Sequence, residues 1–311
     1  MLQILKETHI PFSRLRYVGF ALSGALAVLT LALLLINGGP NYGIDFLGGS
    51  KISIELSSGE VTTEEIRSVL NELGESEVKI FKIQSVGNER FQIQVPPKTA
   101  LVVREEDKSF SKQLIDKLIA LHPDTKISLI SEETISAAFG KEMQSRAIYT
   151  LLLGLALILV YIWIRIDFRF GAGTVLAVFH DVWITLGIIT LLGIRIDITV
   201  VAAFLTIIGY SVNDSIVISK RIQELIKTRK GATLIENVDD GINTTLSRTI
   251  VTSITTLFVA LALTIFASKT AIYPFAITMT IGIIIGTYSS AFIVAPTVVE
   301  LNRMFPKRKK A

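Results

Sequence analysis

Residues 148–166 read IYTLLLGLALILVYIWIRI, a run in which Arg165 is the only charged residue. A helix rises about 1.5 Å per residue, so a run of this length nearly crosses the roughly 30 Å hydrocarbon core of a bilayer. A surface helix of a soluble protein would carry charges along one whole face. We therefore expect a membrane-spanning helix here.

Five further runs of the same kind lie on either side of it. The chain has 311 residues, of which 50% are hydrophobic and 19% charged, whereas soluble domains average about 25% charged. The first run resembles a signal peptide, but it is too long and no small-residue cleavage site follows, so we expect a retained anchor. The further predicted spans are residues 17–36, 171–194, 198–219, 249–267 and 275–300.

The distribution of positive charge predicts the orientation in the membrane. Sixteen Lys and Arg residues flank the predicted spans on one side, and the opposite short loops hold only Arg195 and Lys269. By the positive-inside rule, both termini are expected in the cytoplasm and residues 40–145 outside. The basic residues then mark contact with anionic lipid rather than with nucleic acid. The expected cytoplasmic parts are a head, a loop and a tail, at residues 1–16, 220–247 and 301–311.

The polar segment 37–147 predicts a small external domain. Alternating apolar residues indicate strands, and Thr62 followed by Glu65 indicates a capping box at a helix start. Residues 86–89 (VGNE) indicate a hairpin turn. The resulting order is βαββαβ, a ferredoxin-like pattern. The predicted strands are 50–56, 78–84, 90–95 and 126–130, and the predicted helices are 62–73 and 105–121.

Composition excludes several kinds of site. The chain has no cysteine and three histidines, which excludes disulfides, thiolate nucleophiles and cysteine-type zinc sites. No nucleophile–base pair, phosphate loop or ligand cluster stands out. We expect no enzyme, and neither a metal nor a cofactor.

Two ionisable residues lie inside the third predicted span. Such residues cost a few kcal/mol in a bilayer and are seldom neutral passengers. Asp181 is about ten residues from either end of that span, so it must be protonated, paired or facing a wet cavity. A helix–helix hydrogen bond and a role in proton movement are both open. His180 points about 100° away around the helix, so we expect no direct pair with Asp181 and a structural hydrogen bond for His180 rather than a relay.

The fourth and fifth predicted spans each carry a polar face, which includes Asp214 on one and Arg248 on the other. Both faces lie near the expected cytoplasmic loop, so the two charges are at comparable depth and are able to approach. Asp can lose its proton and Arg cannot. An Asp beside a fixed cation, in a site that is alternately wet and dry, can load and release a proton. The predicted proton or ion path comprises Asp214, Arg248, Asp181, His180 and Asn213.

Small residues predict close packing and a turn. Gly282 and Gly286 lie four residues apart in the last span, a spacing that allows close approach of helices. After the first span, Gly43, Gly48 and Gly49 permit positive φ where the chain leaves the membrane. Asp45, with Phe46 beside it, is expected to cap that turn through its own backbone. We expect the motif to be structural rather than a contact for substrate.

Four strings together resemble one family. In that order, with six spans and a βαββαβ external domain, they make the chain similar to the SecF family, the smaller half of the SecDF complex of bacterial protein export. The resemblance covers essentially the whole chain. The strings are GIDFLGG at 43–49, FHDV at 179–182, GYSVNDSIV at 209–217 and SRT at 247–249.

The resemblance implies a relative of the RND transporters in the bacterial inner membrane, paired with SecD beside the SecYEG translocon. Such proteins are thought to use the proton-motive force to export unfolded polypeptides. The family's intramembrane Asp and Arg would be Asp214 and Arg248, with a further carboxylate supplied by SecD. One departure is Asp167-Phe168, where the family usually has Glu and Trp.

Two other functions remain open. A half-size RND-like exporter of lipid or small molecules would use the same intramembrane Asp, but it would need a larger external domain with a ligand pocket than residues 45–135 provide. A membrane scaffold without transduction would make Asp214→Asn silent. The residues do not distinguish protons from sodium ions.

Overall fold

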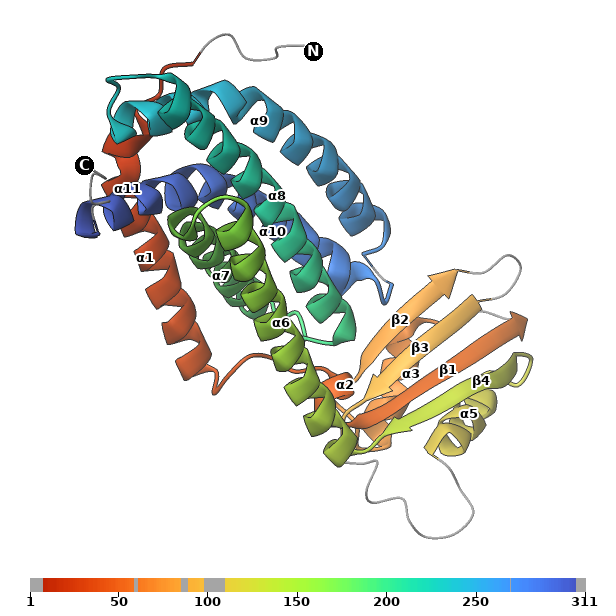
Figure 1. Ribbon diagram of the computed structural model, residues 1–311. Coiled ribbons are helices and arrows are strands. Elements are labelled where there is room, and N and C mark those ends of the chain that lie inside the picture. The colour runs from red at the N-terminus through yellow and green to blue at the C-terminus, as the bar shows by residue number, and fades with distance from the viewer. Residues whose placement is uncertain (1–7, 59–60, 85–88, 98–109, 269, 306–311) are drawn as a thin grey trace.

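The computed structural model describes residues 8–58, 61–84, 89–97, 110–268 and 270–305 (Figure 1). In this part of the chain, six helical segments are long and apolar enough to cross a membrane. A small α+β domain projects from the end of the helical bundle opposite the two termini (Figure 1). The predicted fold class is confirmed. The six segments are α1 (Phe12–Ile36), α6 (Ala137–Arg165), α7 (Phe168–Leu191), α8 (Ile198–Thr228), α9 (Leu234–Phe266), and α10 (Tyr273–Ser289) continued by η1 (Ser290–Val294) and α11 (Ala295–Met304).

The small α+β domain, predicted to be external and called the external domain below, has one antiparallel sheet in the order β2-β3-β1-β4, which is the ferredoxin-like arrangement. In the register of the central pair, Ile52 lies opposite Ile93 and Ile54 opposite Phe91. The predicted hairpin turn and the start of the second predicted helix lie at least partly outside the described residues. The elements are β1 (Gly49–Ser58), α3 (Thr63–Glu72), β2 (Lys79–Gln84), β3 (Glu89–Val95), α5 (Phe110–Leu121) and β4 (Lys126–Ile135).

Alternation of side chains along the strands builds the core of this domain. Successive strand residues point to opposite faces, so Ile52, Ile54 and Ile93 all lie on the face covered by helices and are fully buried. Leu70 of α3 and Leu118 of α5 pack into the same cluster. Each such side chain contributes about 1.5–3 kcal/mol. The predicted capping box at the start of α3 is present, with Thr62 Oγ1 accepting from the backbone N–H of Glu65.

The bundle has an inner and an outer set of helices. The most apolar windows of α7 and of the α10–α11 segment are 56% and 61% buried, whereas those of α6 and α9 are only 6% and 17% buried. Gly282 of α10 lies directly against Ile207 of α8, where any larger residue would collide. α7, α8 and α10 therefore form the packed centre, and the apolar outer faces of α6 and α9 are left for lipid or a partner.

The prediction of a cytoplasmic loop at 220–247 is wrong. α8 continues to Thr228, and α9 already begins at Leu234 with a capping box between Thr233 and Glu236. Charged residues in this stretch indicated departure from the membrane, but a helix does not end where its surface becomes polar. Only residues 229–233 connect the two helices.

The last helix contains a π-helical turn at Ser290–Val294, immediately before Pro296. Proline has no N–H to donate to the carbonyl four residues back, and its ring crowds that carbonyl. Widening of the preceding turn accommodates both effects. The helix thus continues through Pro296 instead of breaking.

The motif after α1 connects the external domain to the bundle. It contains the short helix α2 (Ile44–Leu47), followed by Gly48 at φ +87° and Gly49 at φ +133°. Positive φ is therefore present at these two glycines, but Gly43 has φ −83° and that prediction is wrong. Gly43 is constrained by close approach instead, since its N–H donates to the Ile196 carbonyl at 2.7 Å.

The prediction for Asp45 is also wrong, because its hydrogen-bond partner is a different one. Asp45 Oδ2 accepts from the backbone N–H of Ile198 at 3.1 Å, so it caps the start of α8 rather than its own turn. Asp197, the N-cap residue of α8, accepts from Val200 N–H at 2.9 Å. Two carboxylates thus satisfy the first N–H groups of one helix, where negative charge is favoured. Phe46 beside them is buried.

Candidate functional site

Asp181 is the centre of a polar cluster that joins three helices. Its side chain is fully buried in α7. Its Oδ2 accepts hydrogen bonds from Ser211 Oγ of α8 at 2.7 Å and from Ser289 Oγ of α10 at 2.8 Å. Gly286 lies next to this cluster, since a Cβ there would be in ordinary contact with the same oxygen, at 3.5 Å. These contacts favour the helix–helix hydrogen bond over a wet cavity for Asp181.

His180 lies beside Asp181, contrary to the expectation that the two would not pair. His180 Nδ1 is 3.1 Å from Asp181 Oδ1, so the 100° between adjacent residues on a helix does not keep the two side chains apart. Nε2 of the same ring is buried and has no hydrogen-bond partner among the described residues. Of the two ring nitrogens of His180, only Nδ1 therefore has a hydrogen-bond partner in the described part of the chain.

Asp214 occupies a different environment on α8. Its side chain is only 4% exposed, yet its Oδ2 has no hydrogen-bond partner in the described part of the chain. A buried carboxylate without donors is costly while it is ionised. Asn213, the next residue, is exposed and points away from this buried position. The structure thus separates two residues that the sequence grouped together.

Arg248 is the predicted partner of Asp214. It lies on α9, is exposed, and acts electrostatically on the Asp214 carboxylate. No ion pair within 4 Å joins the two among the residues that the structure describes. Asp214 and Arg248 therefore lie near each other, as predicted, but they are not in direct contact.

A chain of hydroxyl groups runs between α8, α9 and α10, one helical turn from Asp214. Tyr210 Oη donates to Ser253 Oγ at 3.0 Å, and Thr287 Oγ1 donates to the same oxygen at 2.8 Å. Tyr210 and Ser253 belong to the polar faces seen in the sequence, but Thr287 and Ser289 were missed. Both belong to α10, whose small residues drew attention to packing alone.

No group of three or more His, Asp or Glu residues able to hold a metal ion occurs in the described ranges. The polar residues gathered in the bundle are hydroxyls, carboxylates and one imidazole. Such groups can carry a proton or share hydrogen bonds.

Comparison with known proteins agrees with this arrangement. Residues 115–304 match the family model described as protein export membrane protein SecD/SecF, C-terminal. The chain is 37% identical over 308 residues to the protein translocase subunit SecF of Thermodesulfovibrio yellowstonii, covering 97% of this chain and 98% of that protein. It is also 37% identical over 306 residues to the protein translocase subunit SecDF of Thermus thermophilus, covering 96% of this chain but 39% of that longer one.

Solved structures give the same result. A crystal structure of SecDF from Thermus thermophilus, described as a translocon-associated membrane protein, matches with a TM-score of 0.75 and 36% identity over 96% of this chain and 39% of that one. SecDF in a super-membrane-facing form matches with a TM-score of 0.69 and 34% identity over 98% of this chain and 40% of that one. The fused SecDF relatives suggest SecD as a partner of this chain. The chain therefore belongs to the SecF/SecDF family of protein translocase subunits, which are multi-pass membrane proteins.

Proposed function

We propose that this chain, paired with SecD, couples the proton-motive force to the export of unfolded polypeptides through SecYEG. The observation that carries the proposal is the buried carboxylate of Asp214, whose Oδ2 has no hydrogen-bond partner within the described ranges while the cation Arg248 lies nearby on α9. Relatives named protein translocase subunits SecF and SecDF support the setting.

A buried, unpaired carboxylate is suited to carrying a proton. Ionisation in this position is opposed by the loss of water, and protonation removes the charge. When a movement of the bundle admits water, the proton can leave and the nearby Arg248 stabilises the carboxylate that remains. Arg248 keeps its own charge throughout, so one residue titrates and the other does not.

The energy available is sufficient to move the bundle between two states. One charge crossing a membrane potential of 100 mV is worth about 2.3 kcal/mol. That changes the ratio of two conformations by about 50-fold. A proton cycle through Asp214 would thus drive movement of the external domain, which is linked to the start of α8 through Asp45 and to Ile196, just before α8, through Gly43.

Exposed polar residues of the bundle support a partner subunit that covers them. Arg248 and Asn213 are exposed although they belong to the polar faces of α9 and α8. Polar groups facing lipid are expensive, so a partner helix is expected to cover them. SecD is the proposed partner, and it would bring a further carboxylate to the same path.

The orientation follows from charge. We place the ends of α8 and α11, which carry the positive residues, at the cytoplasmic face of the inner membrane. The external domain then lies on the opposite side, where exported chains emerge. The basic flanking residues would contact anionic lipid at the cytoplasmic surface.

The test is the export rate of a secretory protein in cells whose only copy carries Asp214→Asn, at normal protein levels. Asn has nearly the same shape but cannot carry a proton, so export is expected to fall to the rate of cells without the subunit. Asp116→Asn is the matched control, since it makes the same change at an exposed carboxylate of α5, outside the bundle, and is expected to leave export close to normal. Unchanged export with Asp214→Asn, in an assembled complex, would reject proton coupling and leave the scaffold function.

A further inference from the structure

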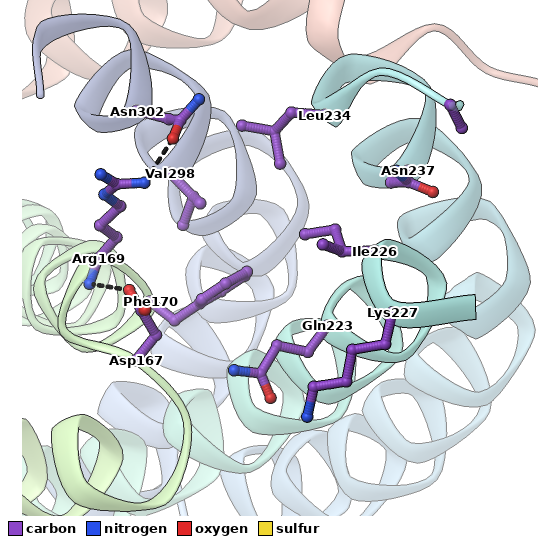
Figure 2. Close-up of a pocket in the computed structure, with 11 residues that line it drawn as sticks. Asp167, Arg169, Phe170, Gln223, Ile226, Lys227, Leu234, Asn237, Val298 and Asn302 are labelled. Carbon is purple, nitrogen blue, oxygen red and sulfur yellow. Dashed lines mark hydrogen bonds between the residues drawn. The ribbon is translucent and has the colours of Figure 1, made fainter. Parts of the chain in front are cut away.

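A cavity of about 320 Å³ lies at the end of the bundle that faces away from the external domain. Four helix ends surround it: the starts of α7 and α9 and the ends of α8 and α11 (Figure 2). Its lining residues are Asp167, Arg169, Phe170, Gln223, Ile226, Lys227, Ala232, Leu234, Asn237, Val298 and Asn302. None of them belongs to the cluster around Asp181 or to the neighbourhood of Asp214.

The cavity carries excess positive charge. The guanidinium of Arg169 donates to Asn302 Oδ1 and to the Phe305 carbonyl, both of which are neutral. Within the described ranges neither Arg169 nor Lys227 has a carboxylate ion pair. Asp167 supplies one negative charge, and its Oδ1 caps α7 through the Arg169 N–H at 3.0 Å. Two cations and one carboxylate leave the lining with a net charge near +1.

The rest of the lining combines carboxamides with apolar side chains. Gln223 Nε2 donates to the Ile166 carbonyl at 2.9 Å, and Asn237 Nδ2 donates to the Thr233 carbonyl at 3.0 Å. Asn237 is 2% exposed and its Oδ1 has no hydrogen-bond partner in the described chain, which leaves an acceptor available. Phe170, Ile226, Leu234 and Val298 form the apolar part.

We propose that this cavity binds the headgroup of an anionic phospholipid whose headgroup carries hydroxyl groups, of the phosphatidylglycerol class. The phosphate would take the charge of Lys227 and the free N–H groups of Arg169, since guanidinium has five donors and two are used. Headgroup hydroxyls would donate to the carboxamide and carboxylate oxygens of the lining.

The exposed apolar residues at the cavity favour a lipid over free phosphate as the ligand. Ile226 lines the cavity and is 44% exposed, and Phe305, whose carbonyl holds Arg169, is 68% exposed. An acyl chain leaving the cavity would cover such surface, whereas a free anion would leave it in water. Basic pockets between spanning helices on the cytoplasmic side are general binding places for anionic headgroups. The bound lipid would hold four helix ends together, and this requires no proton coupling.

The experiment is native mass spectrometry of the purified full chain in detergent, titrated with phosphatidylglycerol or with phosphatidylcholine. Phosphatidylglycerol is expected to bind the original chain about tenfold more tightly, the size of one charge-assisted contact. Lys227→Gln should remove that preference, and Lys227→Arg should keep it. Lys230 lies three residues after Lys227 and does not line the cavity. Lys230→Gln removes the same charge and should change binding by less than about twofold.

Three results would overturn the proposal. Equal binding of the two lipids by the original chain would show that the headgroup is not recognised. Equal loss with Lys227→Gln and Lys230→Gln would show only diffuse attraction to the surface. Displacement of the lipid by soluble glycerol phosphate at similar concentration would assign the cavity to a free phosphate compound.

Discussion

Removing the Asp181 carboxylate should destabilise the bundle strongly, and replacing it by an amide should destabilise it much less. Asp181→Ala leaves the hydroxyls of Ser211 and Ser289 without the oxygen that they share at 2.7 and 2.8 Å. A buried hydroxyl left without its acceptor costs about 1–3 kcal/mol, so we expect a loss of about 3 kcal/mol for the two. Asp181→Asn keeps one oxygen for both hydroxyls, and its amide can donate to His180 Nδ1 in one tautomer of the ring. Its expected cost is about 1 kcal/mol.

The assay is thermal unfolding of the purified full chain in detergent, followed by tryptophan fluorescence. Asp181→Ala is expected to lower the apparent Tm by about 6–12 °C, and Asp181→Asn by about 2–4 °C. Ser211→Ala is a control that removes one of the two donors, and it should fall between them. Equal destabilisation by Ala and Asn would refute the assignment of the effect to the shared oxygen. Normal stability of Asp181→Asn together with lost export would show that Asp181 titrates, against the structural role.

Two further predictions concern the external domain. Gly49→Ala should destabilise β1 by about 1–3 kcal/mol, because Gly49 has φ +133° and a Cβ there would strike the Val95 carbonyl; hydrogen exchange of β1 and β3 in the full chain measures it. Gly74→Ala, with positive φ but open space, is the control, and an equal effect would mean that the collision is unimportant. Burial raises the pKa of Glu75, which is 3% exposed. Its contribution is therefore most favourable below the unfolded pKa and is lost as pH rises through the folded pKa. Glu75→Gln should slow exchange of this domain at pH 7 and have no effect near pH 4, and identical pH profiles would contradict this sign.

The membrane spans were predictable because water and hydrocarbon differ so strongly that a single run of residues decides its own environment. The same local reasoning placed a loop at 220–247, where α8 and α9 continue as helices to Thr228 and from Leu234. Polarity tells where a helix leaves lipid and says nothing about where its hydrogen bonds end. Buried Val238 and Ile242 on the helical part of that stretch were the local signal available.

Partners distant in the chain were not predictable in the same way. The sequence predicted that Asp45 caps its own turn, but its N–H donor is Ile198, 153 residues later. The lipid cavity gathers four helix ends, and no single segment carries its pattern. Motif strings supplied the candidate residues, and only the fold shows which of them touch.

Asp181 and Asp214 illustrate what burial alone cannot decide. Both are carboxylates inside predicted spans, and both are almost wholly buried, at 0% and 4% exposure. Asp181 uses its oxygens to bind two hydroxyls and an imidazole, which ties its side chain to the packing of three helices. Asp214 Oδ2 has no partner in the described chain, so a change in its protonation breaks no bond of that oxygen. A group that must gain and lose a proton repeatedly is better placed where neither state dismantles the fold, and this favours Asp214 as the residue that titrates.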